Sequence, residues 1–412
     1  AIHHEAAGQM HEASTWWVRV GDGARARFAH KEALATYERA LLLRDGDDAG
    51  IWERIGQLHR RHLGRYAEGA EAYERAVTGY LQEHDWPAAV RAYCELAECR
   101  REMGTYAEAA AAAEAGLSLA EAFTAGDGLL ALAHIRLSNA LRSGQLAPRT
   151  EIRDHLETAL DLATCAGADL YAAEARTWLG VLACNEGDPQ RALEHVRDAL
   201  PAFRRSGEVG WETMALNNLA YYSLRAGQPE AARAWAAEGL ILARRAGTLN
   251  SEIWMLATLG QIHLHQGKLD KAEASLQQGL ALADAHGPER LRIGFHHLLA
   301  LVALARGRWD AAVALITAVL SPAERARPQH MAELHIALAR AYLGQTAYPR
   351  AMAQAERACE IAAGKAQRSR EAQAWRILGQ VAAEDGRTAV ATDAFARSLA
   401  LLDAAGDRLE RA

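Results

Sequence analysis

Thirteen side chains that could bind a ligand stand at one place in a repeated sequence pattern. Each lies about one helical turn from a large residue followed by a small one, as in Leu259-Gly260. Arginine holds a carboxylate or phosphate through two parallel hydrogen bonds, and amide, imidazole and phenol groups add further polar contacts. Such a surface suits a peptide, a sugar or a small anion. The thirteen residues are Glu98, Arg101, His134, Arg142, Asn185, Asn217, Tyr221, Arg225, Gln261, His265, His297, Arg340 and Arg376.

The prediction concerns these residues as a group, because a single polar residue more often solvates an exposed helix face than binds a ligand. Tyr221 could stack on a ligand or pack against the next repeat, and the sequence leaves both interpretations open. We expect that replacing Asn217, Tyr221 and Arg225 together by alanine weakens ligand binding with little loss of stability.

Catalytic and metal-binding patterns are missing from the sequence. No nucleophile with a positioned base is recognisable, and no GxxxxGK[ST] phosphate loop occurs. Zinc needs three or four convergent ligands, whereas each pair of neighbouring histidines diverges on its helix or lacks a third ligand. We therefore predict neither an enzyme nor a cofactor or metal site. The pairs are His59 and His62, His263 and His265, and His296 and His297.

Glycines recur along the chain at a nearly constant interval, which indicates a repeat architecture. Their spacings are 40, 40, 43, 40, 40 and 40, and the last interval of 79 spans two repeats with Thr346 at the middle position. Glycine ends a helix well because it adopts the left-handed conformation without a Cβ penalty. The glycines are Gly64, Gly104, Gly144, Gly187, Gly227, Gly267, Gly307 and Gly386.

Each interval reads as two antiparallel helices that cross at small residues. Close crossing requires Gly or Ala on one helix and a larger side chain that fills the space on the other. Pro189 and Pro229 suit the first turn of a second helix, where the missing N–H costs little. One pair cannot bury its apolar face alone, so neighbours must stack. We predict an all-α, right-handed superhelical solenoid of about ten pairs, with a helical junction or cap over residues 1–27 and the solenoid over 28–412.

Three connectors depart from the regular pattern. The interval that holds Pro148 is three residues longer than its neighbours, and we favour a longer loop there over a bend in the superhelix. Pro322 and Pro328 are expected to break the connector before the last two repeats. Between repeats a spacing of four residues to a glycine recurs, at Ala163–Gly167, Ala243–Gly247, Ala283–Gly287 and Leu402–Gly406.

Composition and charge narrow the class of protein. Half of the residues are apolar but only 6% are aromatic, a balance that favours helices over strands. The net charge of −6 argues against direct nucleic-acid binding, which needs a basic face. The five cysteines form no CxxC pair, and no apolar stretch is long enough to span a bilayer. We expect a cytoplasmic protein and, since position 1 is Ala1, a piece of a longer or processed chain.

The repeat resembles long-period tetratricopeptide arrays, and Trp375-x-x-Leu378-Gly379 matches the tetratricopeptide opening best. HEAT and armadillo arrays have comparable periods but lack this large–small signature. The first forty residues resemble the junction at which a STAND- or AAA-type signalling ATPase ends and its C-terminal tetratricopeptide sensor begins, as in maltose-regulon activator-like and large LuxR-type regulators. The segments that carry this resemblance are His3–Gly8, Ala13-x-x-Trp16, Gly21, Ala24 and Phe28-Ala29-His30-Lys31-Glu32-Ala33-Leu34-x-x-Tyr37-x-x-Ala40-Leu41.

The resemblance implies a non-catalytic sensor segment of a bacterial signalling or transcription regulator. It implies a peptide, protein or small-molecule effector in a concave groove, and an upstream ATPase domain as a partner in the parent chain. Two alternatives stay open: a structural adaptor between proteins with no small ligand, and an array that regulates an enzyme under the control of a peptide. The sequence does not give the oligomeric state.

Overall fold

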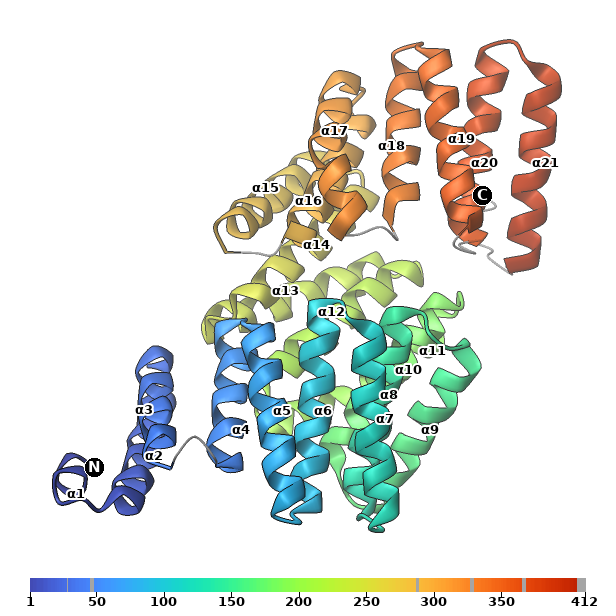
Figure 1. Cartoon of the computed structure of the whole chain (residues 1–412). Helices are drawn as coiled ribbons and strands as arrows, with labels where there is room; N and C mark the ends of the chain where they lie inside the picture. Colours follow the sequence, from blue (N-terminus) through green and yellow to red (C-terminus); the bar gives the residue numbers. More distant parts are fainter. Residues whose placement is uncertain (28, 45–47, 287–288, 327–329, 365–367, 406–412) are drawn as a thin grey trace. The chain divides into compact units, whose positions relative to one another are not determined.

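A computed structural model describes the chain except residues 28, 45–47, 287–288, 327–329, 365–367 and 406–412. All regular structure in the described part is helical, which confirms the predicted all-α class. The chain forms two compact units, unit 1 from Ala1 to Leu182 and unit 2 from Ala183 to Ala412 (Figure 1). Among the residues singled out above, Phe28, Gly287, Pro328 and Gly406 lie outside the described part.

Unit 1 is built mainly from helices of 10 to 18 residues, together with the short α1 and one π-helical turn, η1, that extends α4. In chain order they are α1 (Ile2–Ala6), α2 (Met10–Ala26), α3 (His30–Leu42), α4 (Ala49–Leu58), η1 (His59–Leu63), α5 (Tyr66–Gln82), α6 (Trp86–Met103), α7 (Tyr106–Ala122), α8 (Asp127–Gly144), α9 (Arg149–Cys165) and α10 (Asp169–Asn185), whose last residues belong to unit 2.

Unit 2 continues with helices of 14 to 18 residues. They are α11 (Pro189–Ser206), α12 (Val209–Arg225), α13 (Pro229–Ala246), α14 (Leu249–His265), α15 (Leu269–His286), α16 (Glu289–Ala305), α17 (Trp309–Ala326), α18 (Met331–Gly344), α19 (Tyr348–Gly364), α20 (Arg368–Glu384) and α21 (Thr388–Ala405).

Within each unit, consecutive helices pack as antiparallel pairs in which the even-numbered helix comes first (Figure 1). Four such pairs lie in unit 1 and five in unit 2, and α10 and α11 follow the same order along the chain. The predicted number of about ten pairs is therefore confirmed. First helices also contact one another, as α6 does α8 and as α12, α14, α16, α18 and α20 do in succession. In unit 2 these first helices form a continuous row.

Glycine or a substitute in the left-handed conformation ends most first helices, as predicted. Positive φ occurs at seven of the eight recurring glycines, and Thr346 takes the same conformation with φ 56°. The prediction is wrong at Gly144, which lies inside α8, while Gln145 adopts the left-handed conformation with φ 54°. A Cβ atom on Gly144 would lie 2.5 Å from Cβ of Tyr106, so glycine serves close helix contact there.

Prolines mark helix starts more reliably than connectors in this chain. Pro189 and Pro229 occupy the first turn of α11 and α13, as predicted. Pro322 was expected in a connector but lies inside α17, near its C-terminal end. A proline there removes one backbone hydrogen bond without preventing the last turn of the helix. The extra residues around Pro148 form the connector between α8 and α9.

Small residues at the helix crossings set the spacing of the pairs. A Cβ atom on Gly260 would overlap the side chain of Leu276, and one on Gly379 would lie 2.8 Å from Cε1 of Phe395. Ala232 on α13 is fully buried. The structure thus shows the close crossings that the sequence predicts, while the proposed boundary between residues 27 and 28 stays a prediction.

Candidate functional site

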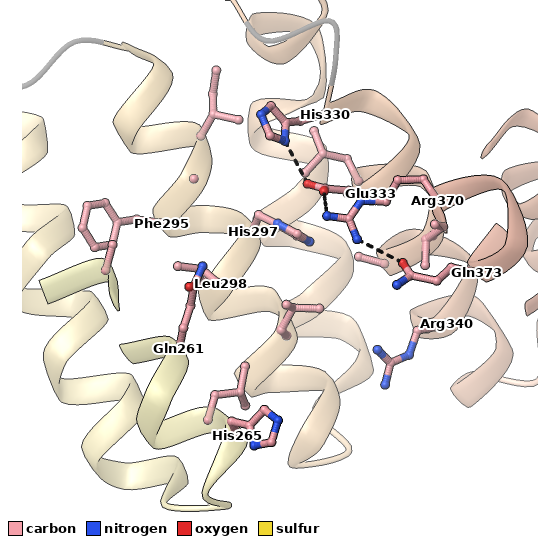
Figure 2. Close-up of a pocket in the computed structure, with 18 of the residues that line it drawn as sticks. Gln261, His265, Phe295, His297, Leu298, His330, Glu333, Arg340, Arg370 and Gln373 are labelled. Atoms are coloured by element: carbon pink, nitrogen blue, oxygen red, sulfur yellow. Dashed lines mark hydrogen bonds and ion pairs between the residues drawn. The ribbon is translucent and has the colours of Figure 1, made fainter. Parts of the chain in front are cut away.

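A pocket of about 770 Å³ lies in unit 2 along the row of first helices. Its lining comes from α12, α14, α16, α18 and α20, with His330 just before α18, and from none of the second helices. Figure 2 shows lining residues from the last four of these helices. This volume is typical of sites that enclose a small ligand or a few peptide residues.

The lining residues repeat with the period of the helix pairs. Trp254, Gly294, Glu333 and Gln373 follow one another at intervals of 40, 39 and 40, so they occupy equivalent positions on four successive first helices. The second of these residues, Gly294 of α16, contributes no side chain to the lining.

The base of the pocket is apolar and its aromatic wall is exposed. Phe295 and Leu298 of α16 are buried beneath it, together with Ile377 of α20. Trp254 and Tyr221 line it from α14 and α12, and 43% and 36% of these residues remain exposed. Exposed aromatic side chains beside a buried apolar base provide contact area for an apolar ligand group.

The charged residues of the lining are four arginines and one glutamate, a formal excess of three positive charges. The carboxylate of Glu333 already has two partners within the protein: it lies 2.5 Å from Nη2 of Arg370 and 3.0 Å from Nδ1 of His330 (Figure 2). Burial opposes the charged form, but the hydrogen bond from His330 and the charge of Arg370 lower the pKa of Glu333 to about 2. The four arginines are Arg225, Arg340, Arg370 and Arg376.

Arg340 and Arg376 stand at the end of the pocket formed by α18 and α20. Both are exposed, and within the described part of the chain neither forms an ion pair with a carboxylate. Burial by its neighbours and the like charge of Arg376 lower the pKa of Arg340. The Arg340–Arg376 pair is therefore positively charged, and no carboxylate among the described residues forms an ion pair with it.

Seven of the thirteen predicted site residues line this pocket. They come from all five first helices, so the structure brings together side chains up to 155 positions apart in the sequence. The prediction that the group forms a ligand-binding surface is nevertheless not tested by their positions alone. The seven are Tyr221, Arg225, Gln261, His265, His297, Arg340 and Arg376.

Two further predicted residues of unit 2 lie outside the lining. The Oδ1 atom of Asn217 accepts a hydrogen bond of 2.7 Å from Oγ1 of Thr258, so its side chain links α12 to α14. Asn185 is exposed at the end of α10. Replacing Asn217 would thus disturb a contact between helices.

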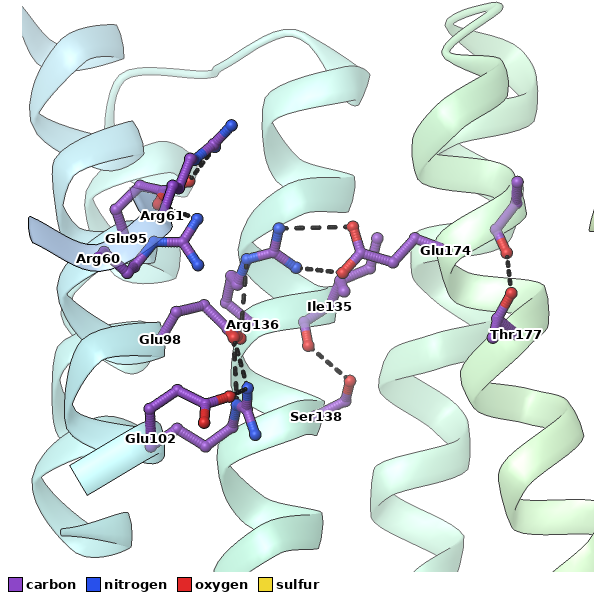
Figure 3. Close-up of polar contacts among 12 residues, drawn as sticks. Arg60, Arg61, Glu95, Glu98, Glu102, Ile135, Arg136, Ser138, Glu174 and Thr177 are labelled. Carbon is purple, nitrogen blue, oxygen red and sulfur yellow. Dashed lines mark hydrogen bonds and ion pairs between the residues drawn. The ribbon is translucent and has the colours of Figure 1, made fainter. Parts of the chain in front are cut away.

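The predicted residues Glu98 and Arg101 lie in unit 1, in a network that we call the charge ladder. Arg136 stands at its centre, 2.5 Å from Oε1 of Glu174 and 3.9 Å from Oε1 of Glu98, while Arg101 contacts Glu98 at 2.9 Å (Figure 3). The ladder contains four arginines and four glutamates in two sets of ion pairs. Arg60, Arg61 and Glu95 form one set, and Glu98, Arg101, Glu102, Arg136 and Glu174 form the other.

Burial and ion pairing act in opposite directions on the buried carboxyl groups of the ladder. At Glu174 burial outweighs the charge of Arg136 and raises the pKa. Burial raises the pKa of a carboxyl group, yet Arg101 and Arg136 lower the pKa of Glu98 to about 2. Positions 60, 98, 136 and 174 follow at a constant interval of 38 and alternate between arginine and glutamate. Arg136 pairs with the glutamates one interval before and one interval after it, and the one-turn pattern used above does not detect this alternation.

The remaining two predicted residues also contact side chains of unit 1. Nδ1 of His134 lies 2.9 Å from Nδ1 of His155 on α9, and burial followed by the charge of His155 lowers the pKa of His134 to about 4. The guanidinium of Arg142 lies 4.4 Å from the ring centroid of Trp178. Neither of them lines the pocket of unit 2.

Some pocket residues that were not predicted lie two helical turns from a predicted one. Trp254 and Glu333 precede the predicted Gln261 and Arg340 by seven positions each, and all four line the same pocket. Residues seven apart share a helix face, so a pattern of two turns along each first helix predicts them.

No group of three histidine, cysteine or acidic residues in the described part could hold a metal ion. None of the helices within the described ranges combines the length and hydropathy of a membrane span.

Sequence comparison identifies repeats over much of the chain. Residues 173–345 match the family model of the MalT-like TPR region, and residues 24–83 and 63–123 match a tetratricopeptide repeat model. Comparison with curated protein sequences gives no match.

Three solved structures share the fold at low sequence identity. A Rap protein complexed with competence and sporulation factor is 11% identical, with a TM-score of 0.63, covering 87% of this chain and 98% of its own. The apo quorum sensor NprR from B. thuringiensis is 15% identical, with a TM-score of 0.58 and coverage of 85% and 97%. A Signal Transduction ATPase with Numerous Domains (STAND) protein with a tetratricopeptide repeat sensor, from Pyrococcus horikoshii, is 15% identical, with a TM-score of 0.54 and coverage of 83% and 54%. The chain therefore spans about half the length of that STAND protein.

Proposed function

On the premise that this chain is a tetratricopeptide-repeat protein, we propose that it is the non-catalytic sensor segment of a signalling regulator and that the pocket of unit 2 holds a peptide effector. The observation that carries the proposal is the pocket itself. It joins an apolar base and exposed aromatic rings to arginines that have no acidic partner among the described residues.

Proteins with the same fold support this assignment. One of them is a Rap protein complexed with competence and sporulation factor, and another is a quorum sensor. The residues that match the MalT-like model, 173–345, include the parts of α12, α14, α16 and α18 that line the pocket. The five free cysteines agree with a cytoplasmic setting, where thiols stay reduced.

We further propose that the effector controls an ATPase domain in the parent chain. Support comes from the STAND protein, which contains a tetratricopeptide repeat sensor and of which this chain covers 54%. An ATPase domain encoded together with this segment, whose activity responds to the effector, is the expected finding.

Peptide binding can be tested by affinity selection. The immobilised chain is incubated with a synthetic pool of random heptapeptides, and retained peptides are identified by mass spectrometry. We expect retention of a defined subset, and its loss in the double variant Tyr221→Ala/Trp254→Ala, because both rings line the pocket. Trp16→Ala is a matched control, since Trp16 of unit 1 is 44% exposed and Trp254 is 43% exposed.

A selected peptide should also raise the melting temperature of the chain. A ligand that binds only the folded state adds about 2.7 kcal/mol at a concentration one hundred times its Kd. Retention of no peptide by the wild-type chain, or unchanged retention by the double variant, contradicts a peptide site in this pocket. Stable capture of a folded partner without any peptide binding would instead support a structural adaptor.

A further inference from the structure

The aromatic side chains of the pocket and its Arg340–Arg376 pair lie on different first helices. Its aromatic residues Tyr221 and Trp254 come from α12 and α14, whereas Arg340 and Arg376 come from α18 and α20. A ligand long enough to span these helices therefore meets the two rings on α12 and α14, with Arg225 beside Tyr221, and the guanidinium groups of Arg340 and Arg376 on α18 and α20.

The four arginines of the lining differ in what already neutralises them. Arg370 is paired with Glu333 at 2.5 Å, and its Nη1 atom also donates to Oε1 of Gln373 at 3.4 Å (Figure 2). Arg340 and Arg376 have no carboxylate partner within the described ranges and face each other's charge. Two like charges in proximity destabilise each other, and a bound anion would offset that repulsion.

Glutamine side chains accompany the two arginines in the lining. Gln380 follows Arg376 by one turn on α20, Gln373 precedes it by one turn, and Gln261 lines the pocket from α14. A primary amide both donates and accepts hydrogen bonds, as a peptide backbone does, whereas a bare phosphate or sulfate offers only acceptors. The combination of amides, two guanidinium groups and an apolar wall matches a peptide that carries a carboxylate.

We propose that the occupant is a short acidic peptide whose carboxylate binds Arg340 and Arg376 while an apolar residue packs on Trp254 and Tyr221. This inference rests on the proposed function of the pocket and names the chemistry of its ligand. The carboxylate can be an aspartate or glutamate side chain or the C-terminus of the peptide, and both bind the guanidinium fork in the same way.

The composition of the selected peptides tests this inference separately from peptide binding itself. Two pools of random heptapeptides, one with free C-termini and one with amidated C-termini, are offered to the wild-type chain. Enrichment of aspartate or glutamate in both pools indicates a side-chain carboxylate. Selection from the free pool alone indicates the C-terminus.

The decisive variants are Arg340→Gln/Arg376→Gln and the control Arg245→Gln. Arg245 is an exposed arginine on α13, outside the pocket, and its replacement also removes positive charge from the surface of unit 2. We expect the best selected peptide to bind the double variant at least about tenfold more weakly, because charge-assisted hydrogen bonds are lost. The control should bind as the wild type does, and added salt should weaken wild-type binding.

The outcomes separate the two proposals. The proposal of an acidic ligand is wrong if the selected peptides have neither acidic residues nor a free C-terminus. It is also wrong if they bind the double arginine variant as tightly as the wild type. Either result leaves the proposed function of the pocket unaffected. If the wild-type chain retains no peptides, both the pocket function and this inference are wrong. The same holds if Tyr221→Ala/Trp254→Ala retains peptides as well as the wild type does. Circular dichroism of each variant confirms that the exposed substitutions leave the helices intact.

Discussion

The charge ladder of unit 1 and the pocket of unit 2 contain the same number of arginines but different numbers of acids. In unit 1 the charge ladder opposes four arginines to four glutamates, each of which forms at least one ion pair. In unit 2 the pocket lining opposes four arginines to the single Glu333. Polar residues of first helices thus serve cohesion where an opposite charge contacts them from a neighbouring helix, and can serve binding where no described carboxylate does.

The largest expected effect concerns the centre of the charge ladder. Arg136→Met leaves Glu98 and Glu174 buried without their shared partner, with 11% and 6% of their side chains exposed. Removing one member of a buried ion pair costs about 3–5 kcal/mol, and urea denaturation followed by circular dichroism measures the loss. A loss below about 1 kcal/mol would mean that the ladder contributes little to cohesion.

The second prediction concerns His134, which was predicted to face a ligand but pairs with His155. Its folded pKa of about 4 lies below the ordinary value of 6.5, so the folded state favours the neutral ring. The resulting stability is present above pH 6.5 and is lost as the pH falls toward 4. Between pH 7 and pH 4.5, the free energy of unfolding should therefore fall by about 1–3 kcal/mol less in His134→Asn than in the wild type. Urea denaturation at each pH measures the difference. Equal losses would show that this ring does not titrate with folding.

Glu333, the acidic residue of the pocket, should stabilise unit 2 less than Arg136 stabilises unit 1. Glu333→Gln removes the charge that Arg370 and His330 contact, and we expect a loss of about 1–2 kcal/mol at pH 7. The pKa of Glu333 is lowered to about 2, so its contribution exists above pH 4.5 and disappears as the pH falls toward 2. Denaturation at pH 7 and pH 3 should therefore give a smaller difference between variant and wild type at the lower pH. A constant difference would contradict an ion-pair role.

The smallest effect is expected at the end of the pocket that holds the two like charges. Arg340→Gln removes a charge that has no acidic partner in the described part and that Arg376 repels. The free energy of unfolding should change by less than about 0.5 kcal/mol, as for other surface substitutions without partners. A loss above about 1 kcal/mol in urea denaturation would show that Arg340 supports the fold.

Much of the fold could be predicted because the glycine register and the helix pairing depend on the same local physics. A residue free to adopt positive φ must end each first helix, and the chain supplies one in nearly every repeat. Gly144 and Pro322 were misassigned because tertiary contact in one case, and tolerance near a helix end in the other, overrode the local signal.

The candidate site was harder to predict, because one helix face does not reveal what stands opposite it. Glu98 and Arg340 look alike as polar residues near a large–small pair. Glu98 meets Arg136 from the next first helix, whereas Arg340 meets another arginine, Arg376. What distinguishes the two cases is the charge of the partner on the next first helix, which lies 38 positions after Glu98 and 36 positions after Arg340.

Hydrogen–deuterium exchange with and without a selected peptide tests the central claim most directly. We predict that the peptide slows exchange in α14, α18 and α20, whose side chains line the pocket, and leaves α6 and α8 of the charge ladder unchanged. Slower exchange in α6 and α8 with no change in α14, α18 and α20 would contradict the assignment of binding to unit 2 and of cohesion to unit 1.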